Sequence, residues 1–363
     1  IFAAIALIVV NEAFALEFIV RGNVNEMYDD NTNTSPDNPE SDWITNMMLG
    51  AALRSEGRSR EFELSANVYQ QYSFNNEENR SNYQDLGLSI NKALGERVNV
   101  TIEDVFQRYP ESKSFGTLFG RSEDDTGYIS NDFSAGFSVD MTRHFFFGVL
   151  YNNGIMKNNS DTMADSVSHN PGGYLGYNIN SSNILRGGYM YTLMKYDDGN
   201  TRRGDRGYGE YEHHFTEQLR AVLHGGYDYN DSNEGQSLSS RWMASVVNDI
   251  DESNRLNITY LKESTISNIV NDTLNNWRIS CSLGRMVSER TGAGLTLFYG
   301  KGTYEISGAK EELAGVSFAL SYIVTDFINF NAGYNYTWNS STETGSDEVS
   351  YKRNQAFAGL TVQ

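Results

Sequence analysis

The chain has 363 residues, of which 47 are acidic and 28 basic, and its formal net charge is −19. A soluble domain of this length buries a large aliphatic core, and 39% hydrophobic residues, many of them Tyr and Phe, is little for that purpose. The aromatic content argues against disorder, the acidic balance against a nucleic-acid partner, and the lone Cys281 permits no intramolecular disulfide.

The first residues predict an export signal. Residues 1–10 are a short apolar run, and Ala13-Phe14-Ala15 fits the small-x-small rule for cleavage, which would start the mature chain at Leu16. Because no Met or basic segment precedes Ile1, we expect the sequence to begin inside this signal peptide, 1–15. The alternative is a buried strand or helix of about ten residues, since a membrane helix needs roughly 18 apolar residues in a row.

After this segment, apolar and polar residues alternate in stretches of about ten residues. The clearest is INFNAGYNYTWN, residues 328–339, in which apolar residues alternate with Asn, Gly and Thr. Because side chains of a strand point to alternate faces, each stretch predicts a strand with one apolar and one polar face. Some stretches are less regular; in residues 98–106, for example, Asp104 interrupts the apolar face. The other clear stretches, in chain order, are 61–74, 98–106, 185–193, 277–283 and 314–324.

The junctions between these stretches alternate between short and long. The short junctions are 55–59, 94–97, 141–143, 181–183, 215–218, 251–254, 288–290 and 324–327. The long and polar junctions are 29–42, 75–82, 109–126, 157–171, 197–206, 230–237, 262–275, 301–312 and 339–350. This alternation predicts about 18 antiparallel strands, with both chain ends on the side of the short turns.

A membrane barrel accounts for this pattern. Its strands are apolar outside and polar inside, and it must close because unpaired strand edges are not tolerated in hydrocarbon. A soluble β-sandwich or propeller would need more aliphatic residues, and a propeller also a repeat of about 40–50 residues. We therefore predict an all-β fold over residues 16–363, a transmembrane antiparallel up-and-down β-barrel. It would have short periplasmic turns and long extracellular loops, and lie in the outer membrane of a Gram-negative bacterium.

Two motifs resemble a known family. Tyr28-Asp29-Asp30-Asn31 at the end of the first strand and RNQAFAGLTV, residues 353–362, look like the putative β-barrel porin type 2 family of Gram-negative bacteria. Some members are implicated in exopolysaccharide export. Barrels of this kind usually finish on an aromatic residue, whereas this chain stops at Gln363, with Val362 on the apolar face. Truncation would explain the difference, and a natural end at Gln363 would weaken recognition by the barrel-insertion machinery.

The predicted inward face is polar and carries charges of both signs. A barrel of 16 to 18 strands encloses an aqueous channel unless something fills it. Phe115, Leu118 and Phe119 in the longest loop either fold inward as a constriction or pack the loop against its neighbours. The candidate lumen-lining residues are Glu61, Glu63, Glu103, Arg186, Glu210, Glu212, His214, Arg220, His224, Arg241, Arg278, Asn329 and Asn331.

The long loops carry most of the negative charge, and the largest share lies in residues 29–42. Solvated loops outside the cell are the simpler interpretation. A more specific interpretation is divalent-cation binding, because Asp29, Asn31 and Asn33 place oxygen ligands at calcium-like spacing. The later Gly and Glu of a complete calcium loop are missing, and Asx-rich turns look similar without metal. We therefore predict no metal and no cofactor, and keep these three residues as a weak calcium candidate.

An enzyme is the competing class of protein. The chain has no G-x-S-x-G elbow and no H-E-x-x-H motif. Glu210, Glu212 and His214 share a strand face, with His224 roughly opposite Glu210 across the turn 215–218. These four residues could form a metal or acid–base site, but charge pairs in a lumen are the commoner arrangement. We predict that the protein is not an enzyme.

The predicted function is passive passage of hydrophilic material through an outer-membrane pore, and the resemblance favours exopolysaccharide export. The alternatives are a general small-solute porin and a structural or adhesive barrel with a blocked lumen. The expected partners are outer-membrane lipid and lipopolysaccharide, the barrel-insertion machinery and, by the resemblance, polysaccharide-export proteins.

Overall fold

The computed structural model describes residues 16–75, 81–109, 127–159, 164–232, 235–267, 272–305, 307–342 and 349–363. The predicted signal segment 1–15 and the residues Phe115, Leu118 and Phe119 lie outside these ranges. The described residues form 18 β-strands, and they contain no helix that is long and apolar enough to cross a membrane.

The strands follow one another along the chain. The first nine are β1 (Glu17–Asp29), β2 (Asp42–Gly57), β3 (Arg60–Ser73), β4 (Ser81–Leu94), β5 (Val98–Tyr109), β6 (Tyr128–Asp140), β7 (Phe145–Asn158), β8 (Ser166–Asn180) and β9 (Asn183–Tyr196). The others are β10 (Thr201–His214), β11 (Leu219–Ser232), β12 (Gly235–Asp251), β13 (Asn254–Ser267), β14 (Asp272–Ser288), β15 (Thr291–Tyr304), β16 (Lys310–Thr325), β17 (Ile328–Thr342) and β18 (Val349–Val362).

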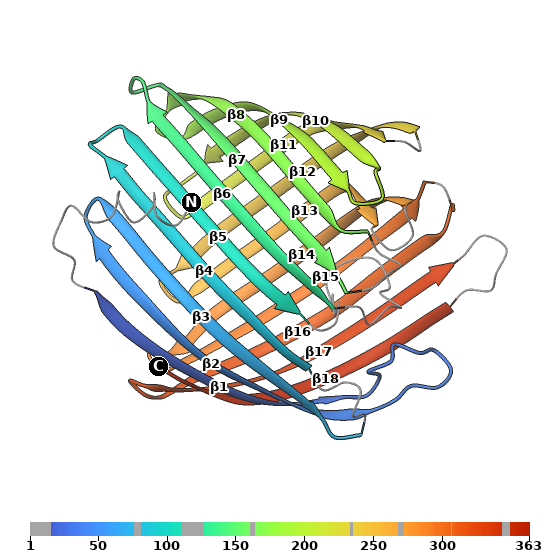
Figure 1. The fold of residues 1–363 in the computed structure, drawn as a ribbon. Helices are drawn as coiled ribbons and strands as arrows, with labels where there is room; N and C mark the ends of the chain where they lie inside the picture. The colour runs from blue at the N-terminus through green and yellow to red at the C-terminus, as the bar shows by residue number, and fades with distance from the viewer. Residues whose placement is uncertain are drawn as a thin grey trace.

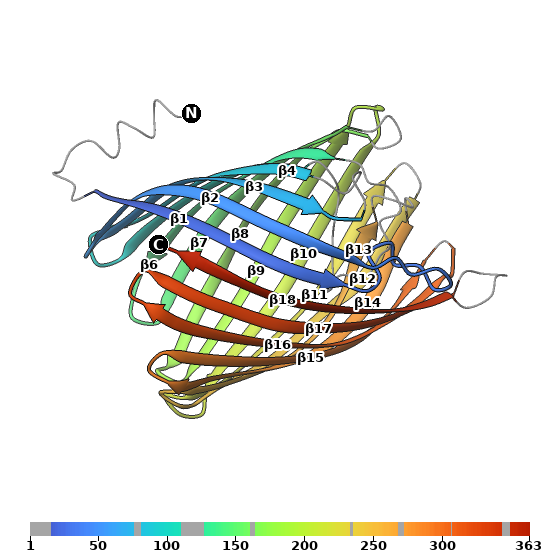
Figure 2. The same ribbon diagram turned by 90° about the horizontal axis from the view of Figure 1, so that it is seen from below.

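The sheet closes on itself. Each strand pairs antiparallel with the next one in sequence, and β1 also pairs with β18, from Gly22 opposite Val362 to Asp29 opposite Gln355. Both described chain ends therefore lie at one end of the barrel, as Figures 1 and 2 show. We call this end the short-turn end and the opposite one the long-loop end. The predicted antiparallel up-and-down β-barrel of about 18 strands is confirmed.

Large hydrophobic side chains stand on the outside of this wall. Phe318 on β16 and Tyr334 on β17 are paired in the register and are 44% and 43% exposed. Exposed hydrophobic side chains of this kind run round the barrel from Phe18 on β1 to Leu360 on β18. The only cluster of buried hydrophobic residues among those described is small and consists of Leu274, Tyr304 and Ala309. This arrangement explains the modest aliphatic content, because the hydrophobic side chains cover the outside of the barrel and no large core has to be filled.

Aromatic rings bracket the apolar exterior. Towards the long-loop end, the Tyr28 and Trp43 rings lie 5.2 Å apart, and Trp277 lies 5.7 Å from Tyr299. Towards the short-turn end, Phe145 and Tyr177 lie 4.7 Å apart. Tyr and Trp rings prefer the boundary between an apolar and an aqueous phase. These two aromatic rows mark the two edges of an apolar band.

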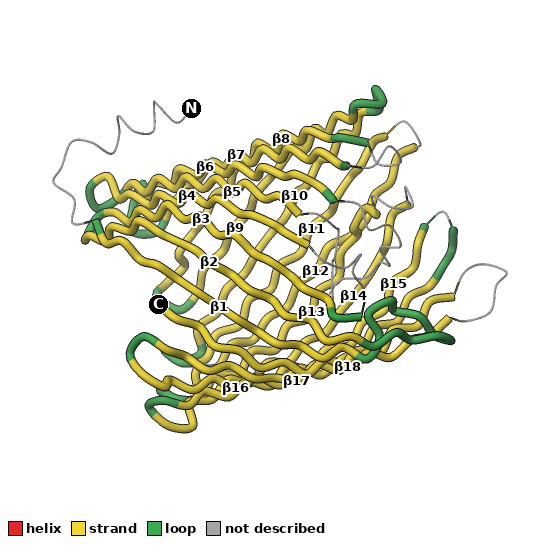
Figure 3. Tube along the Cα trace, turned by 60° about the horizontal axis from the view of Figure 1, so that its bottom comes forward, coloured by secondary structure: helices red, strands yellow, loops and turns green. Residues whose placement is uncertain are grey.

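The short connections agree closely with the predicted ones, and Figure 3 shows them gathered at one end. Most are two to four residues long, such as 58–59, 181–182 and 215–218. The connection 95–97 begins with Gly95, whose φ of 76° is unfavourable for other residues.

At the long-loop end, several predicted loops are wrong in extent. The strands β9 and β10 leave only 197–200 between them, where 197–206 was expected, and β11 and β12 leave only 233–234, where 230–237 was expected. The predicted loops 262–275, 301–312 and 339–350 are likewise shortened by strand residues. The physical reason is that backbone pairing continues past the apolar band. There both faces of a strand are polar, and alternation no longer marks it.

Candidate functional site

The inner face of β9, β10 and β11 carries a compact group of charged side chains. The register places Arg186 and His224 on either side of Glu210. The Arg186 guanidinium donates to Glu210 and, at 3.1 Å, to Glu212. His214 Nε2 lies 2.8 Å from Glu212 Oε1, and His224 Nδ1 lies 3.6 Å from Glu210 Oε2. We call these five residues the inner cluster. Its carboxylates face one guanidinium and two imidazoles.

Aromatic rings frame the inner cluster. Tyr208 stacks on His224 with ring centroids 4.9 Å apart, and the Arg186 guanidinium lies 5.9 Å from the centroid of Phe146. A Cβ atom at Gly188 would lie 2.4 Å from the Tyr208 ring, so the glycine lets this ring lie against the wall. Stacking and cation–π contact hold the guanidinium and the imidazole in place.

Further ion pairs extend the charged lining. Most join neighbouring strands, but Arg21 of β1 reaches Glu63 of β3 across β2. Each such pair offsets its own charges while keeping the wall strongly polar. The pairs on either side of the inner cluster are Arg206–Asp228 at 2.5 Å, Arg241–Glu263 at 3.2 Å and Arg21–Glu63 at 3.0 Å.

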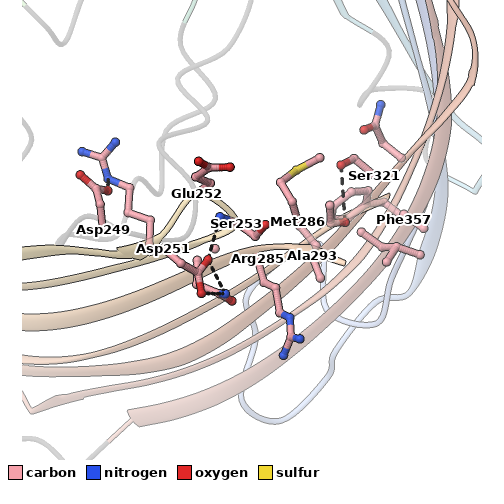
Figure 4. Close-up of a pocket in the computed structure, with 18 residues that line it drawn as sticks. Asp249, Asp251, Glu252, Ser253, Arg285, Met286, Ala293, Ser321 and Phe357 are labelled. Atoms are coloured by element: carbon pink, nitrogen blue, oxygen red, sulfur yellow. Dashed lines mark hydrogen bonds and ion pairs between the residues drawn. The ribbon is translucent and has the colours of Figure 1, made fainter. Parts of the chain in front are cut away.

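The wall from β14 to β18 has a different, largely uncharged lining of small and amide side chains. We call it the neutral sector, and its inward residues include Ser282, Gly294, Ala319, Asn331 and Gly359. Near the short-turn end, a cavity of about 810 Å³ extends along this sector from the turn 252–253 to Phe357. Figure 4 shows Met286 and Ser321 on its concave side, with Arg285 pointing away from it. The cavity exists because small side chains leave the space in front of the wall free.

The remaining predicted lining residues are spread over the same inner face. Glu61 and Glu103 are exposed and lie opposite Asn91 and Ser134. Arg220 pairs in register with His214, Arg278 lies on β14 and Asn329 lies opposite Thr361. Glu63, Arg241 and Asn331 take part in the contacts described above. Of the predicted set, the structure brings together only the five members of the inner cluster.

The calcium candidate residues have other partners. Asp29 is buried and accepts hydrogen bonds from Arg353 Nε at 2.8 Å and from Gln355 Nε2 at 2.9 Å. The Asn31 side chain donates to the Ser35 and Lys352 carbonyl oxygens, and Asn33 is an exposed loop residue. No group of three or more His, Cys, Asp or Glu residues arranged for a metal occurs in the described part of the chain.

The acidic loop 29–42 is therefore less of a free anionic surface than its composition indicates. Besides Asp29, Asp30 accepts hydrogen bonds from the backbone and side chain of Asn354, both at 2.6 Å. Asp42 is buried and accepts from the Phe74 and Asn75 backbone amides at 3.1 and 3.0 Å. The acidic residues of this loop that remain exposed are Asp37 and Glu40.

Sequence reasoning missed the partners of several predicted residues. Arg206 is the last residue of the predicted loop 197–206 and Asp228 lies two residues before the predicted loop 230–237, although their ion pair belongs to the inner wall. Arg21 and Arg353 were not singled out, because their partners Glu63 and Asp29 lie 42 and 324 residues away in the chain. Extending the polar–apolar alternation past the aromatic rows would have placed Arg206 and Asp228 on the inner face.

The inner wall therefore suits hydrated solutes. Ion pairs and further charged side chains line one side, and hydroxyl, amide and backbone groups line the other, so hydrogen-bond donors and acceptors are available all round the wall. In the inner cluster, Arg186 occupies carboxylate oxygens that a metal ion would need.

Comparison with known proteins adds a likeness in fold. No family model matches the chain, and no curated protein matches its sequence. The siderophore receptor PirA from Pseudomonas aeruginosa is similar with a TM-score of 0.50 and 9% identity, over 94% of this chain and 79% of that chain. The FrpB iron transporter from Neisseria meningitidis, F3-3 variant, is similar with a TM-score of 0.50 and 8% identity, over 99% and 83% of the two chains. Both are named as a receptor or a transporter, and at such identities the shared property is the barrel.

Proposed function

We propose that the protein is an outer-membrane β-barrel pore of a Gram-negative bacterium through which hydrophilic material passes passively. The observation that carries this proposal is the contrast between the two faces of a closed wall. Outside, exposed side chains such as Phe318 and Leu360 form an apolar band between aromatic rows. Inside, the inner cluster and the neutral sector are polar. A bilayer on one side and water on the other satisfy both faces.

The proposed orientation follows from the two ends. Bacterial barrels of this type have short periplasmic turns and longer extracellular loops. The short-turn end, with Leu16 and Gln363, would therefore face the periplasm, and the loop 29–42 would lie outside the cell. Such a barrel would be inserted by the barrel-insertion machinery and be surrounded by outer-membrane lipid and lipopolysaccharide.

Exopolysaccharide is the cargo we favour within this function. The motifs at Tyr28–Asn31 and at residues 353–362 resemble the putative β-barrel porin type 2 family, some of whose members are implicated in exopolysaccharide export. The neutral sector supports the idea, because its hydroxyl and amide groups match those of a sugar chain. Polysaccharide-export proteins on the periplasmic side would be the partners. A general small-solute porin is the second candidate, since ion pairs such as Arg241–Glu263 suit a water-filled pore for small solutes as well as one for a polysaccharide.

Two assays separate these possibilities. Liposomes that contain the purified protein should swell in neutral oligosaccharides, and protein-containing liposomes that do not swell would contradict a pore and favour a blocked structural barrel. A strain without the gene should lose secreted polysaccharide. Normal secretion together with rapid swelling would remove the export proposal and leave a general porin.

A further inference from the structure

The outward face of β5, β7 and β9 carries a row of basic side chains near the long-loop end. Arg108, Lys157 and Lys195 are all exposed, although the chain as a whole has a net charge of −19. They share this face with Ile155 and Val167, which are 38% and 36% exposed in the apolar band. We call Arg108, Lys157 and Lys195 the basic strip. Its members lie on alternate strands, about 10 Å apart for a strand spacing of 4.8 Å.

The basic strip has no carboxylate partner within the described residues. Arg108 and Lys157 both lie opposite Ile129, and Lys195 lies opposite Val167 and Thr201. Asp165, just before β8, accepts a hydrogen bond from the Asn158 backbone amide at 2.8 Å, and no ion pair joins it to Lys157.

One further basic residue on this face does not belong to the strip. Arg203 on β10 is exposed and lies directly opposite Asp231 of β11 in the register. A carboxylate in this position weakens the attraction of Arg203 for a further anion.

A second group of outward polar side chains lies on β5 to β8, two to six residues further from the long-loop end than the basic strip. The Asn131 amide donates to Asp104, and the Tyr151 hydroxyl and the Asn153 amide lie 2.8 and 3.2 Å from His169 Nδ1. We call these five residues the polar row. Asp104 and Asn153 lie four residues from Arg108 and Lys157, which is a depth of about 10 Å at about 3.4 Å per residue and a strand tilt of about 40°. Because the interfacial layer of a bilayer is about 5–8 Å deep on each side, the polar row would lie at its inner boundary when the basic strip lies at headgroup level.

The same level elsewhere on the barrel differs. On β15 and β16, Lys301 is paired with Glu312. On β1 to β3, the outward residues Glu26, Thr45 and Tyr72 are paired in the register, and Thr45 donates to Glu26 at 2.8 Å. Within the described residues, the basic strip and the polar row below it together distinguish this sector from β1 to β3 and from β15 and β16.

We infer that this sector binds an anionic glycolipid of the outer leaflet through its phosphate groups. The guanidinium and ammonium groups of the basic strip match phosphate oxygens, and the polar row offers partners to the amide, ester and hydroxyl groups between headgroup and acyl chains. The apolar band below takes the acyl chains. The inference rests on the proposed membrane location, and it does not depend on the barrel being open.

The test compares two lipids and two variants. Native mass spectrometry of the detergent-solubilised barrel, titrated with diphosphorylated lipid A, should show retained lipid. The same lipid without its phosphates should bind at least about tenfold more weakly, as should diphosphorylated lipid A on the triple variant Arg108→Gln, Lys157→Gln, Lys195→Gln.

The matched control removes three other exposed outward lysines near the same end, Lys262, Lys310 and Lys352, each replaced by Gln. It should retain the lipid like the wild type, and unchanged heat-modifiable migration should show that both variants fold.

Equal binding of the two lipids, or an equal loss of binding in the control variant, would overturn the inference. A third result would also overturn it: the wild type forms a dimer, the triple variant does not, and neither lipid is preferred. The sector would then join two copies of the chain. Swelling of protein-containing liposomes should be unchanged, which separates this result from a failure of the pore proposal.

Discussion

A buried ion pair lies at the seam where the barrel closes. Asp29 and Arg353 are 0% and 8% exposed as side chains, and they join the first strand to the last. Composition assigned Asp29 to a solvated acidic loop, yet its carboxylate is buried and accepts from Arg353 and Gln355. Removing one member of a buried ion pair leaves the other charge uncompensated, and this is more costly than losing an exposed pair.

Replacing Arg353 by Met should therefore lower the free energy of unfolding by about 3–5 kcal/mol, because Asp29 would stay buried without its counter-charge. The control is Arg255→Met, whose partner Asp249 lies 3.4 Å away with both side chains more than half exposed. It should cost less than about 1 kcal/mol. Urea unfolding of the folded protein measures both changes, and similar losses in the two variants would show that the seam pair is not special.

At the scale of the strand, alternation predicted the faces well and the ends poorly. The stretch from Ile328 to Asn339 is a strand with Tyr334 outside and Asn331 inside, as its pattern indicates. Beyond the apolar band, pattern recognition failed, because residues such as Arg206 pair through their backbone while both faces are polar. The partners of individual charges depend on register between distant segments, as for Arg21 and Glu63, and one strand's pattern does not contain that information.

Neighbouring positions on β16 test the assignment of faces. Phe318→Arg places a charge on the apolar exterior and should lower the stability in lipid vesicles by about 2–4 kcal/mol. Ala319→Arg, one residue along, faces the cavity of the neutral sector and should change the stability by less than about 1 kcal/mol. Both residues are exposed in the structure, so only the surroundings differ. Equal destabilisation of the two variants would contradict the assignment of inside and outside.

At the scale of the whole molecule, closure of the sheet combines eighteen amphipathic strands into one wall with an apolar outer face and a polar inner face. The number of strands and the grouping of short turns at one end followed from the sequence, because both are local properties. The division of the inner wall into a charged side around Glu210 and the neutral sector around Asn331 did not. It arises only when the register brings small residues of five neighbouring strands side by side.

The proposed orientation predicts which end of the barrel is accessible from outside the cell. In a background in which Cys281 is replaced by Ser, Pro36→Cys should react on intact cells with a membrane-impermeant maleimide. Gly57→Cys, in the turn region of the opposite end, should react only after the outer membrane is permeabilised. Both positions are exposed in the structure, so access depends on sidedness alone. Surface labelling at Gly57→Cys with none at Pro36→Cys would reverse the orientation.

The central claim, that the closed wall spans a membrane around a water-filled interior, is tested most directly by electrical recording across a planar lipid bilayer. Purified protein should insert and produce discrete, stable conductance steps, because paired charges and a neutral sector leave the interior accessible to hydrated ions. Inserted barrels that are correctly folded, shown by heat-modifiable migration, and yet give no conductance would contradict the account.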